Sequence, residues 1–313
     1  MTEAPRIAVL GAGAVGCYFG GMMARAGLPV TLIARPPHRE AIASEGLVIE
    51  SFRFPEPLRI PIETAAEPEA VRGAALVLFC VKTVDTENAV RQIAPYLDRG
   101  AVVVSMQNGV DNVERIRTAS GVDALGCAVY VGVEMRAPGI VRHSGRGDLI
   151  VGRFPGSNAP AELVESCCAA AGIPCRRVDD IRPPLWTKMF INCAYNAVSA
   201  LGHSRYGAMA QRQDIRELTR IVVNEAVSVA RAEGVPLPDE DFVATAWNLA
   251  ASMPNAMSST AQDLLRGKRT EIDSLNGYIA RRGQQHGVAT PVNQTLYTLV
   301  KLLEDSLLAS QKG

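Results

Sequence analysis

One stretch of the sequence combines a lysine with amides at helical spacing. Between residues 188 and 201, the side chains other than Met, Phe, Ile, Cys, Ala, Val and Leu are Lys188, Asn192, Tyr195, Asn196 and Ser199. At ~100° per residue on a helix, these five fill an arc of about 100°. Burial lowers the pKa of a lysine and suits it to proton transfer. The stretch therefore predicts a mostly buried helix whose narrow polar stripe lines a cleft, with a lysine suited to proton transfer beside amides that can orient a carbonyl or hydroxyl.

The same stripe has a purely structural alternative. A polar strip also occurs on helices at domain or subunit interfaces, where Lys188 would extend its amine to water along its aliphatic stem. A surface helix would normally carry several charges on its polar face, whereas this one carries a single charge. Spacing alone leaves both interpretations open.

A glycine-rich turn near the start of the chain predicts a dinucleotide site. The apolar segment 7–10 has the character of a strand and is followed by a turn that opens a helical pattern, Gly11-Ala12-Gly13-Ala14-Val15-Gly16. In this setting the glycines allow a tight turn, close approach of a pyrophosphate and close packing of helix on strand. The helix N-terminus then faces the phosphates. The alternative is a glycine-rich turn without a ligand.

The residue that ends the second strand distinguishes NAD from NADP. NAD sites usually place a carboxylate there, and NADP sites place a cation. Here Arg35 follows the strand, with His38 and Arg39 close behind and no carboxylate before Glu40. Because Arg35 can bind a 2′-phosphate through two hydrogen bonds, we expect NADP as the cofactor. The alternative is a solvated surface arginine.

Alternating strands and helices must position these groups in the first half of the chain. Segments 7–10, 30–33, 76–81 and 102–104 are short and apolar, which is typical of buried parallel strands. Helices are expected near 14–26 and 86–97. Right-handed βαβ units of this kind build a doubly wound sheet. Segments 128–134, 140–143 and 148–152 predict a hairpin-rich extension.

Helical periodicity dominates the second half. Helices are expected near 185–201, 213–233, 239–252, 259–266, 271–286 and 291–309. Gly234 and Gly287 mark helix ends, and Pro291 marks a first turn. Ser259-x-x-Gln262 and Thr270-x-x-Asp273 have the spacing of capping boxes, and the second would put Glu271 in a first helical turn, where acids are favoured.

Together these patterns predict an α/β protein of two domains. Paired charges and prolines at 179–184 indicate the boundary. Residues 1–182 would form an N-terminal doubly wound Rossmann-type parallel sheet that binds NADP. Residues 183–313 would form a C-terminal all-α domain that supplies catalytic and substrate-binding residues.

Composition argues against several other classes of function. Lys plus Arg equals Asp plus Glu, 32 each, so no electrostatic footprint for nucleic acid or an anionic membrane is expected. The four histidines lack metal-ligand spacing, and we expect no metal. Seven cysteines without a C-x-x-C pair favour free thiols in a reducing cytoplasm. Residues 7–24 are apolar like a signal peptide, but their five glycines fit a phosphate loop better.

Five segments, in this order and spacing, resemble the ketopantoate reductase (2-dehydropantoate 2-reductase) family over essentially the whole chain. Each alone is a weak signal. The segments are Gly11-Ala12-Gly13-Ala14-Val15-Gly16, Cys80-Val81-Lys82-Thr83, Gln107-Asn108-Gly109-Val110, Leu185-Trp186-Thr187-Lys188 with Asn192 and Asn196, and Arg269-Thr270-Glu271-Ile272-Asp273.

The resemblance implies hydride transfer from NADPH to the keto carbon of a small 2-keto acid. Lys188 would protonate the developing alkoxide. Lys82 and Asn108 would lie beside the cofactor, Lys82 towards the phosphates and Asn108 nearer the nicotinamide. Glu271 would bind the distal hydroxyl of the substrate and Ser259 its carboxylate, with Asn192 and Asn196 as further substrate ligands. In the family this reaction lies on the pantothenate route to coenzyme A.

Two departures from the family pattern leave the substrate open. Tyr206 and Ala256 stand where the family has asparagines. The expected function is reduction of ketopantoate, and the first alternative is an NADP-dependent reductase or dehydrogenase acting on another keto or hydroxy acid. A non-catalytic NADP-binding sensor is the third hypothesis, and Lys188, Asn192 and Glu271 disfavour it. The oligomeric state stays open, with a homodimer among the options.

Overall fold

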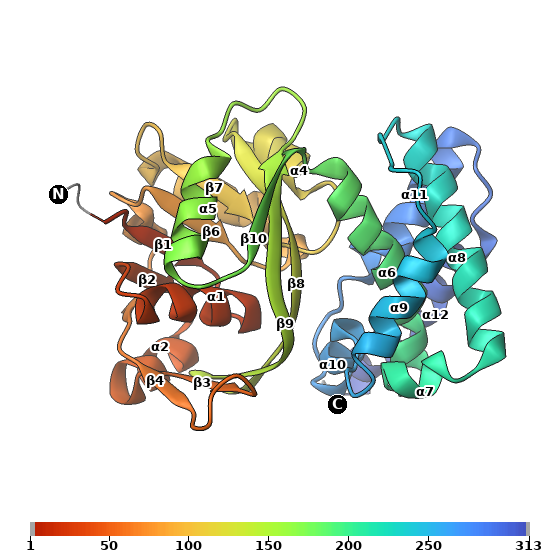
Figure 1. Ribbon diagram of the computed structural model, residues 1–313, viewed down its shortest axis with the longest axis horizontal. Helices are drawn as coiled ribbons and strands as arrows, with labels where there is room; N and C mark the ends of the chain where they lie inside the picture. Colours follow the sequence, from red (N-terminus) through yellow and green to blue (C-terminus); the bar gives the residue numbers. More distant parts are fainter. Residues whose placement is uncertain (1–3, 311–313) are drawn as a thin grey trace. The chain divides into compact units, whose positions relative to one another are not determined.

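The chain divides into two compact units in the computed structural model, which describes residues 4–310 (Figure 1). The first unit comprises Met1–Gln107 and Asp111–Ile181. The second comprises Arg182–Gly313 together with Asn108–Val110. The segment Asn108–Val110 therefore belongs with the second unit, although its neighbours in the sequence on both sides belong to the first.

A ten-stranded sheet forms the first unit. The parallel part has the strand order β5-β2-β1-β6-β7-β8, which is that of a doubly wound dinucleotide-binding sheet, and the predicted fold class is confirmed. The strands of this part are β1 (Ile7–Leu10), β2 (Val30–Ile33), β5 (Glu63–Ala65), β6 (Leu76–Phe79), β7 (Val102–Ser105) and β8 (Ala124–Ala137).

The expected hairpin-rich extension consists of two long strands rather than three short ones. β8 and β9 (Ile140–Arg153) pair antiparallel over 14 residues each, with irregularities in register that absorb the polar stretch around Arg146. Arg146 has a φ of 56°, so a distorted strand continues where the sequence suggested a break. The sheet is completed by β3 (Leu47–Ser51), β4 (Leu58–Ile60) and β10 (Cys175–Asp180).

Alternation along the buried strands covers both faces of this sheet. Ile7 and Val9 share a core with side chains of α1, α2 and α5, whereas Ala8 and Leu10 share another with α3 and α4. Successive strand residues point to opposite faces, so strands that are apolar throughout need helices on both. The helices are α1 (Ala14–Arg25), α2 (Pro36–Glu45), α3 (Thr86–Ile93), α4 (Asn112–Ser120) and α5 (Ala161–Ala170), with short 3-10 turns η1 (Pro68–Val71), η2 (Thr83–Asp85) and η3 (Ala94–Tyr96).

The second unit consists of helices around α6. This helix packs against α8, α9, α10 and α12, and the ring of its Phe190 lies 4.9 Å from that of Phe242. Gly234 and Gly287 follow helix ends with φ of 67°, as expected. The helices are α6 (Arg182–Leu201), α7 (Tyr206–Ala210), α8 (Gln213–Ala232), α9 (Phe242–Ser252), α10 (Ser259–Leu265), α11 (Asn276–His286) and α12 (Pro291–Ser310), with the 3-10 turn η4 (Ile272–Ser274).

Two features of this unit differ from expectation. The short helix α7 was not predicted, because five residues are too few to show a helical period. The helix expected at 271–286 begins only at Asn276, because residues 272–274 form a separate 3-10 turn and Leu275 leaves helical geometry with φ −113° and ψ −110°. Glu271 therefore precedes a short turn instead of lying in the first turn of a helix.

Candidate active site and dinucleotide loop

Three of the predicted site residues meet within the second unit. Asn108 Oδ1 accepts a hydrogen bond from Lys188 Nζ at 2.9 Å, and Asn108 Nδ2 donates to Glu271 Oε2 at 3.0 Å. A lysine can only donate and an ionised carboxylate can only accept, so these partners determine which end of the amide faces each of them. Asn108 thus links the predicted general acid to the predicted substrate-binding carboxylate.

Different local structures hold these three side chains. Lys188 lies on α6, while Glu271 lies at the start of η4. Asn108 is followed by Gly109, whose φ of 102° is a conformation that favours glycine. The chain bends at this glycine, directly after the residue that contacts Lys188 and Glu271.

The C-terminal half of the polar stripe on α6 is used for packing within the protein. Asn196 is 3% exposed, and its Oδ1 accepts a hydrogen bond from the Tyr206 hydroxyl at 3.5 Å. Ser199 is fully buried; it donates to the Ser204 carbonyl at 2.8 Å and accepts from the Ser258 amide at 3.3 Å. Lys188 and Asn192 are only partly buried. The second half of the stripe therefore packs inside the helical unit, while the cleft predicted for Lys188 and Asn192 stays a prediction.

Tyr206 is a hydrogen-bond donor in this cluster. Burial raises the pKa of its phenol above the usual range, so the hydroxyl is protonated at neutral pH. It therefore donates to Asn196 and occupies that amide oxygen. Tyr206, which stands where the family has an asparagine, thus bonds to Asn196 inside the helical unit.

The capping interpretation of Ser259 is wrong by one residue. Ser258 is the N-cap of α10, and its Oγ accepts a hydrogen bond from the Ala261 amide at 3.1 Å. Ser258 is buried, whereas Ser259 is exposed at the first helical position. Gln262 donates to the Met257 carbonyl instead of closing a capping box. Ser258 and Ser259 are adjacent in the sequence, and either could have been the N-cap. The buried serine, Ser258, is the one that caps the helix.

The second proposed capping box does not form either. Thr270 Oγ1 donates to Glu304 and accepts from the Ile272 amide at 3.3 Å, and Asp273 accepts from Tyr297 and Lys301, so neither side chain caps an α-helix. Glu304 lies 34 residues from Thr270 in the sequence. No local pattern points to this contact, which sequence reasoning missed.

The glycine-rich loop of the first unit has the geometry of a dinucleotide site. Gly11 has a φ of 102°, and a Cβ there would lie 2.9 Å from backbone atoms of Cys80 and Val81, after the adjacent strand β6. This junction of β1 and β6 is where the strand order reverses. Gly13 is the N-cap of α1, and a Cβ there would meet no atom within 4 Å. The loop is therefore crowded on its inner side and open on the side where a pyrophosphate would approach.

Arg35 lies beside this loop as the N-cap residue of α2. Its side chain is 88% exposed, and its guanidinium is 3.8 Å from a carboxylate oxygen of Asp85. Exposed ion pairs contribute little to stability, so this contact does not prevent Arg35 from binding another anion. Lys82 directly precedes η2, which contains Asp85, and so lies close to Arg35 in the fold.

A buried polar network connects the ends of β6 and β7. Gln107 Nε2 donates to Thr86 Oγ1 at 2.7 Å, and Gln107 Oε1 accepts from Ser105 Oγ at 2.9 Å. Thr86 in turn donates to the carbonyl of Thr83, next to Lys82. Gln107 belongs to one of the family-like segments, yet its positioning role was not anticipated.

Within residues 4–310, no group of His, Cys, Asp or Glu side chains is arranged to hold a metal ion, and no helix is long and apolar enough for a membrane span.

Comparison with known proteins identifies the family. The model of ketopantoate reductase PanE/ApbA matches residues 7–156, and that of the ketopantoate reductase PanE/ApbA C terminal matches residues 180–304. This chain belongs to the ketopantoate reductase family. The 2-dehydropantoate 2-reductase of Halobacterium salinarum is 32% identical to this family member, over 96% of the chain and 99% of that relative. The 2-dehydropantoate 2-reductase of Vibrio cholerae is 30% identical, over 96% of this chain and 98% of that relative.

Solved structures agree with this assignment. A PanE/ApbA family ketopantoate reductase from Ralstonia eutropha JMP134 is 46% identical, with a TM-score of 0.87 over 96% of this chain and 99% of that one. D-mandelate dehydrogenase with NADH and anilino(oxo)acetate reaches the same TM-score at 24% identity, which shows a shared fold. This member of the ketopantoate reductase family is therefore an oxidoreductase that acts on CH–OH groups with a nicotinamide cofactor.

Proposed function

We propose that this protein uses NADPH to reduce a 2-keto acid, with ketopantoate as the first candidate and Lys188 as the general acid. The observation that carries the proposal is the hydrogen-bonded series Lys188–Asn108–Glu271. The lysine of this series can bind a reacting carbonyl, and its carboxylate can bind a hydroxyl of the same substrate. The product would be pantoate, a precursor of pantothenate and coenzyme A.

Each member of the series has a distinct task in this proposal. Lys188 Nζ donates a hydrogen bond to the keto oxygen and gives it a proton as negative charge develops there. Asn108 Oδ1 holds the ammonium in place, and Glu271 accepts the hydrogen bond of the distal hydroxyl. Asn192, one turn after Lys188, donates its amide to the substrate, and Ser259 binds the carboxylate. Asn196, whose Oδ1 accepts from Tyr206, would contact the substrate through its Nδ2 amide. Bound NADPH would supply the hydride.

The cofactor assignment rests on the first unit. The segments assigned to the cofactor are the turn Gly11-Ala12-Gly13 and the first turn of α1, Ala14-Val15-Gly16, with space for a pyrophosphate next to Gly13. Arg35 and Lys82 supply cations near this loop, and Arg35 is the candidate ligand of the 2′-phosphate. We accordingly assign NADP binding to residues 1–182 and catalysis to 183–313, with Asn108 grouped with the latter. The free cysteines among residues 4–310 support a cytoplasmic location.

Replacing Gly13 and Gly16 with alanine should separate cofactor binding from folding. A Cβ at Gly16 would lie 2.2 Å from the Gly11 carbonyl oxygen. Overpacking typically costs ~1–3 kcal/mol, so the midpoint of thermal unfolding of G16A should fall. G13A should unfold like the wild type but bind NADPH more weakly, because its methyl group would occupy the space left for the pyrophosphate. Thermal unfolding and NADPH fluorescence titration measure both effects. Wild-type NADPH affinity in G13A would contradict the proposed loop.

The substrate is tested by NADPH oxidation across a panel of 2-keto acids that includes ketopantoate, 2-ketoisovalerate and aromatic 2-keto acids. We expect ketopantoate to be reduced with weakened binding, because Ala256 lacks an amide and the Tyr206 phenol is bonded to Asn196. An unpaired buried polar group costs ~1–3 kcal/mol, so hydrogen-bonding sites discriminate strongly.

Three outcomes of this panel separate the candidate functions. A preference for ketopantoate of more than about a hundredfold would show that Tyr206 and Ala256 do not affect the pocket. A better substrate with a larger or more apolar tail would support the second candidate, a related reductase for another 2-keto acid. Binding of NADPH without reduction of any acid would favour the sensor.

A further inference from the structure

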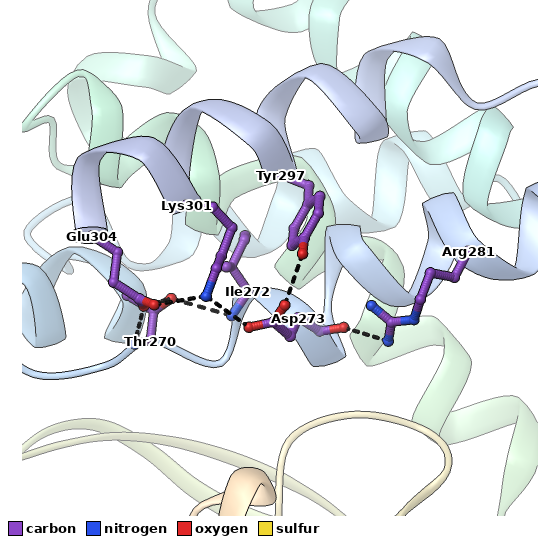
Figure 2. Close-up of polar contacts among 7 residues, drawn as sticks. All are labelled: Thr270, Ile272, Asp273, Arg281, Tyr297, Lys301 and Glu304. Carbon is purple, nitrogen blue, oxygen red and sulfur yellow. Dashed lines mark hydrogen bonds and ion pairs between the residues drawn. The ribbon is translucent and has the colours of Figure 1, made fainter. Parts of the chain in front are cut away.

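The last helix, α12, places a buried carboxylate against the segment that holds Glu271. Glu304 is 2% exposed, and acidic side chains are almost never this buried without partners. Its Oε2 accepts hydrogen bonds from the Thr270 amide at 2.6 Å and from Thr270 Oγ1 at 2.7 Å (Figure 2). Its Oε1 accepts from Lys301 Nζ at 2.8 Å.

These partners keep Glu304 charged. Burial alone would raise the pKa of its carboxyl, but the hydrogen bonds from Lys301 and Thr270 outweigh that effect and hold the pKa below its usual range. An ionised carboxylate forms stronger hydrogen bonds than a neutral acceptor. Glu304 therefore fixes the backbone amide and the hydroxyl of Thr270 together.

A second arm of the same cluster holds the chain on the other side of Glu271. Lys301 also donates to Asp273 Oδ2 at 3.1 Å, and the Tyr297 hydroxyl donates to Asp273 Oδ1 at 2.9 Å. Arg281 donates to the Asp273 carbonyl at 2.8 Å, as Figure 2 shows. Residues 270 and 273 are thus both tied to α12, and Lys301 bridges the two carboxylates.

Local structure is too short to fix Glu271 in place. The turn Ile272–Ser274 has three residues and closes with a hydrogen bond from the Ser274 amide to the Glu271 carbonyl at 2.9 Å. Isolated 3-10 turns of this length are weak elements. A buried ion pair is also not the best means of stabilising a core, because apolar replacements are often as stable. The cluster is therefore better suited to orienting the backbone around Glu271 than to stabilising the fold.

We propose that Glu304 is a positioning residue, which acts through the Thr270 amide to aim Glu271 at the distal hydroxyl of the substrate. The proposal rests on the function proposed above, in which Glu271 binds that hydroxyl. Because Glu271 also accepts a hydrogen bond from Asn108, Glu304 helps to set the substrate end of the series that contains Lys188.

The test compares Glu304→Gln with the matched control Asp305→Asn, which alters an exposed carboxylate on the same helix. Each variant is assayed with ketopantoate and with trimethylpyruvate, the same acid without the distal hydroxyl. In E304Q, kcat/KM for ketopantoate should fall about tenfold, mainly through KM, the size expected for one weakened charged hydrogen bond. The value for trimethylpyruvate should change less than about twofold, and D305N should resemble the wild type with both acids.

A double-variant experiment separates positioning from a general structural effect. In a Glu271→Ala background, E304Q should cause no further loss with ketopantoate, because the residue that it positions is absent. Thr270→Ser, which keeps the hydroxyl, should behave like the wild type. Thr270→Val removes the bonds of this hydroxyl to Glu304 and to the Ile272 amide, should lower kcat/KM for ketopantoate, and serves if E304Q fails to fold. Equal losses for both acids, or additive losses with Glu271→Ala, would overturn the proposal.

Hydrogen exchange tests the positioning role of Glu304 independently of the proposed function. If the wild type reduces neither acid, the proposed function fails, and positioning is then measured without substrate. Faster exchange of amides 270–274 in E304Q, with α6 and α8 unchanged, would support positioning. Unchanged exchange, or faster exchange throughout the helical unit, would overturn it.

Discussion

Replacing Lys188 with alanine should lower turnover by ~10²–10⁴, the usual contribution of a general acid, while NADPH affinity and thermal stability stay near the wild-type values. The structure supports the separation of these effects. Lys188 is partly buried and its ammonium donates to Asn108, whereas most of the buried side chains of α6, such as Phe190, are apolar. Steady-state kinetics, NADPH titration and thermal unfolding measure the three quantities.

Lys268→Ala is the matched control for this variant. Lys268 is an exposed lysine of the same unit, and its loss should leave turnover unchanged. A loss of less than tenfold in K188A would mean that the lysine is structural, and the interface or sensor interpretation would then gain support. A large loss of stability in K188A would show that the Lys188–Asn108 hydrogen bond holds the unit together.

The sequence was most informative where chemistry and local pattern coincide. Gly11 and Gly13 lie between β1 and α1, and Gly16 lies in the first turn of α1, so the glycine spacing together with the flanking strand and helix patterns predicted the turn that the structure shows. The stripe on α6 likewise follows from helical periodicity, because Lys188 and Asn192 are one turn apart. In both cases the relevant neighbours lie within a few residues along the chain.

Prediction failed where a partner is distant in the sequence. Glu304 contacts Thr270 across 34 residues, and Asn108 contacts Glu271 across 163 residues. The capping signals at Ser259 and Thr270 were equally local, yet burial of Ser258 and the carboxylate of Glu304 determined which interaction forms. Tertiary contacts of this kind override local preference and leave no periodic signal.

The second large effect is expected at Arg35. Arg35→Ala should weaken NADPH binding roughly ten- to a hundredfold, because a charge-assisted hydrogen bond to phosphate contributes ~1.5–3 kcal/mol. NADH lacks the 2′-phosphate, so its affinity should change little. Fluorescence titration with both cofactors measures the difference, and the ratio of the two affinities removes any general effect on the loop.

Two further variants show whether Arg35 acts through its position or only through its charge. Arg39→Ala removes a cation from α2 and should change the NADPH-to-NADH ratio much less than R35A does, because Arg35, the N-cap of α2, lies nearer to the end of β2. Asp85→Asn removes the carboxylate 3.8 Å from Arg35 and should strengthen NADPH binding slightly, since exposed pairs contribute at most ~1 kcal/mol. Equal losses for NADPH and NADH in R35A, or a wild-type preference for NADH, would show that Arg35 does not bind the 2′-phosphate. The cation for that phosphate would then have to come from a neighbouring loop, where Lys82 is the next residue to replace.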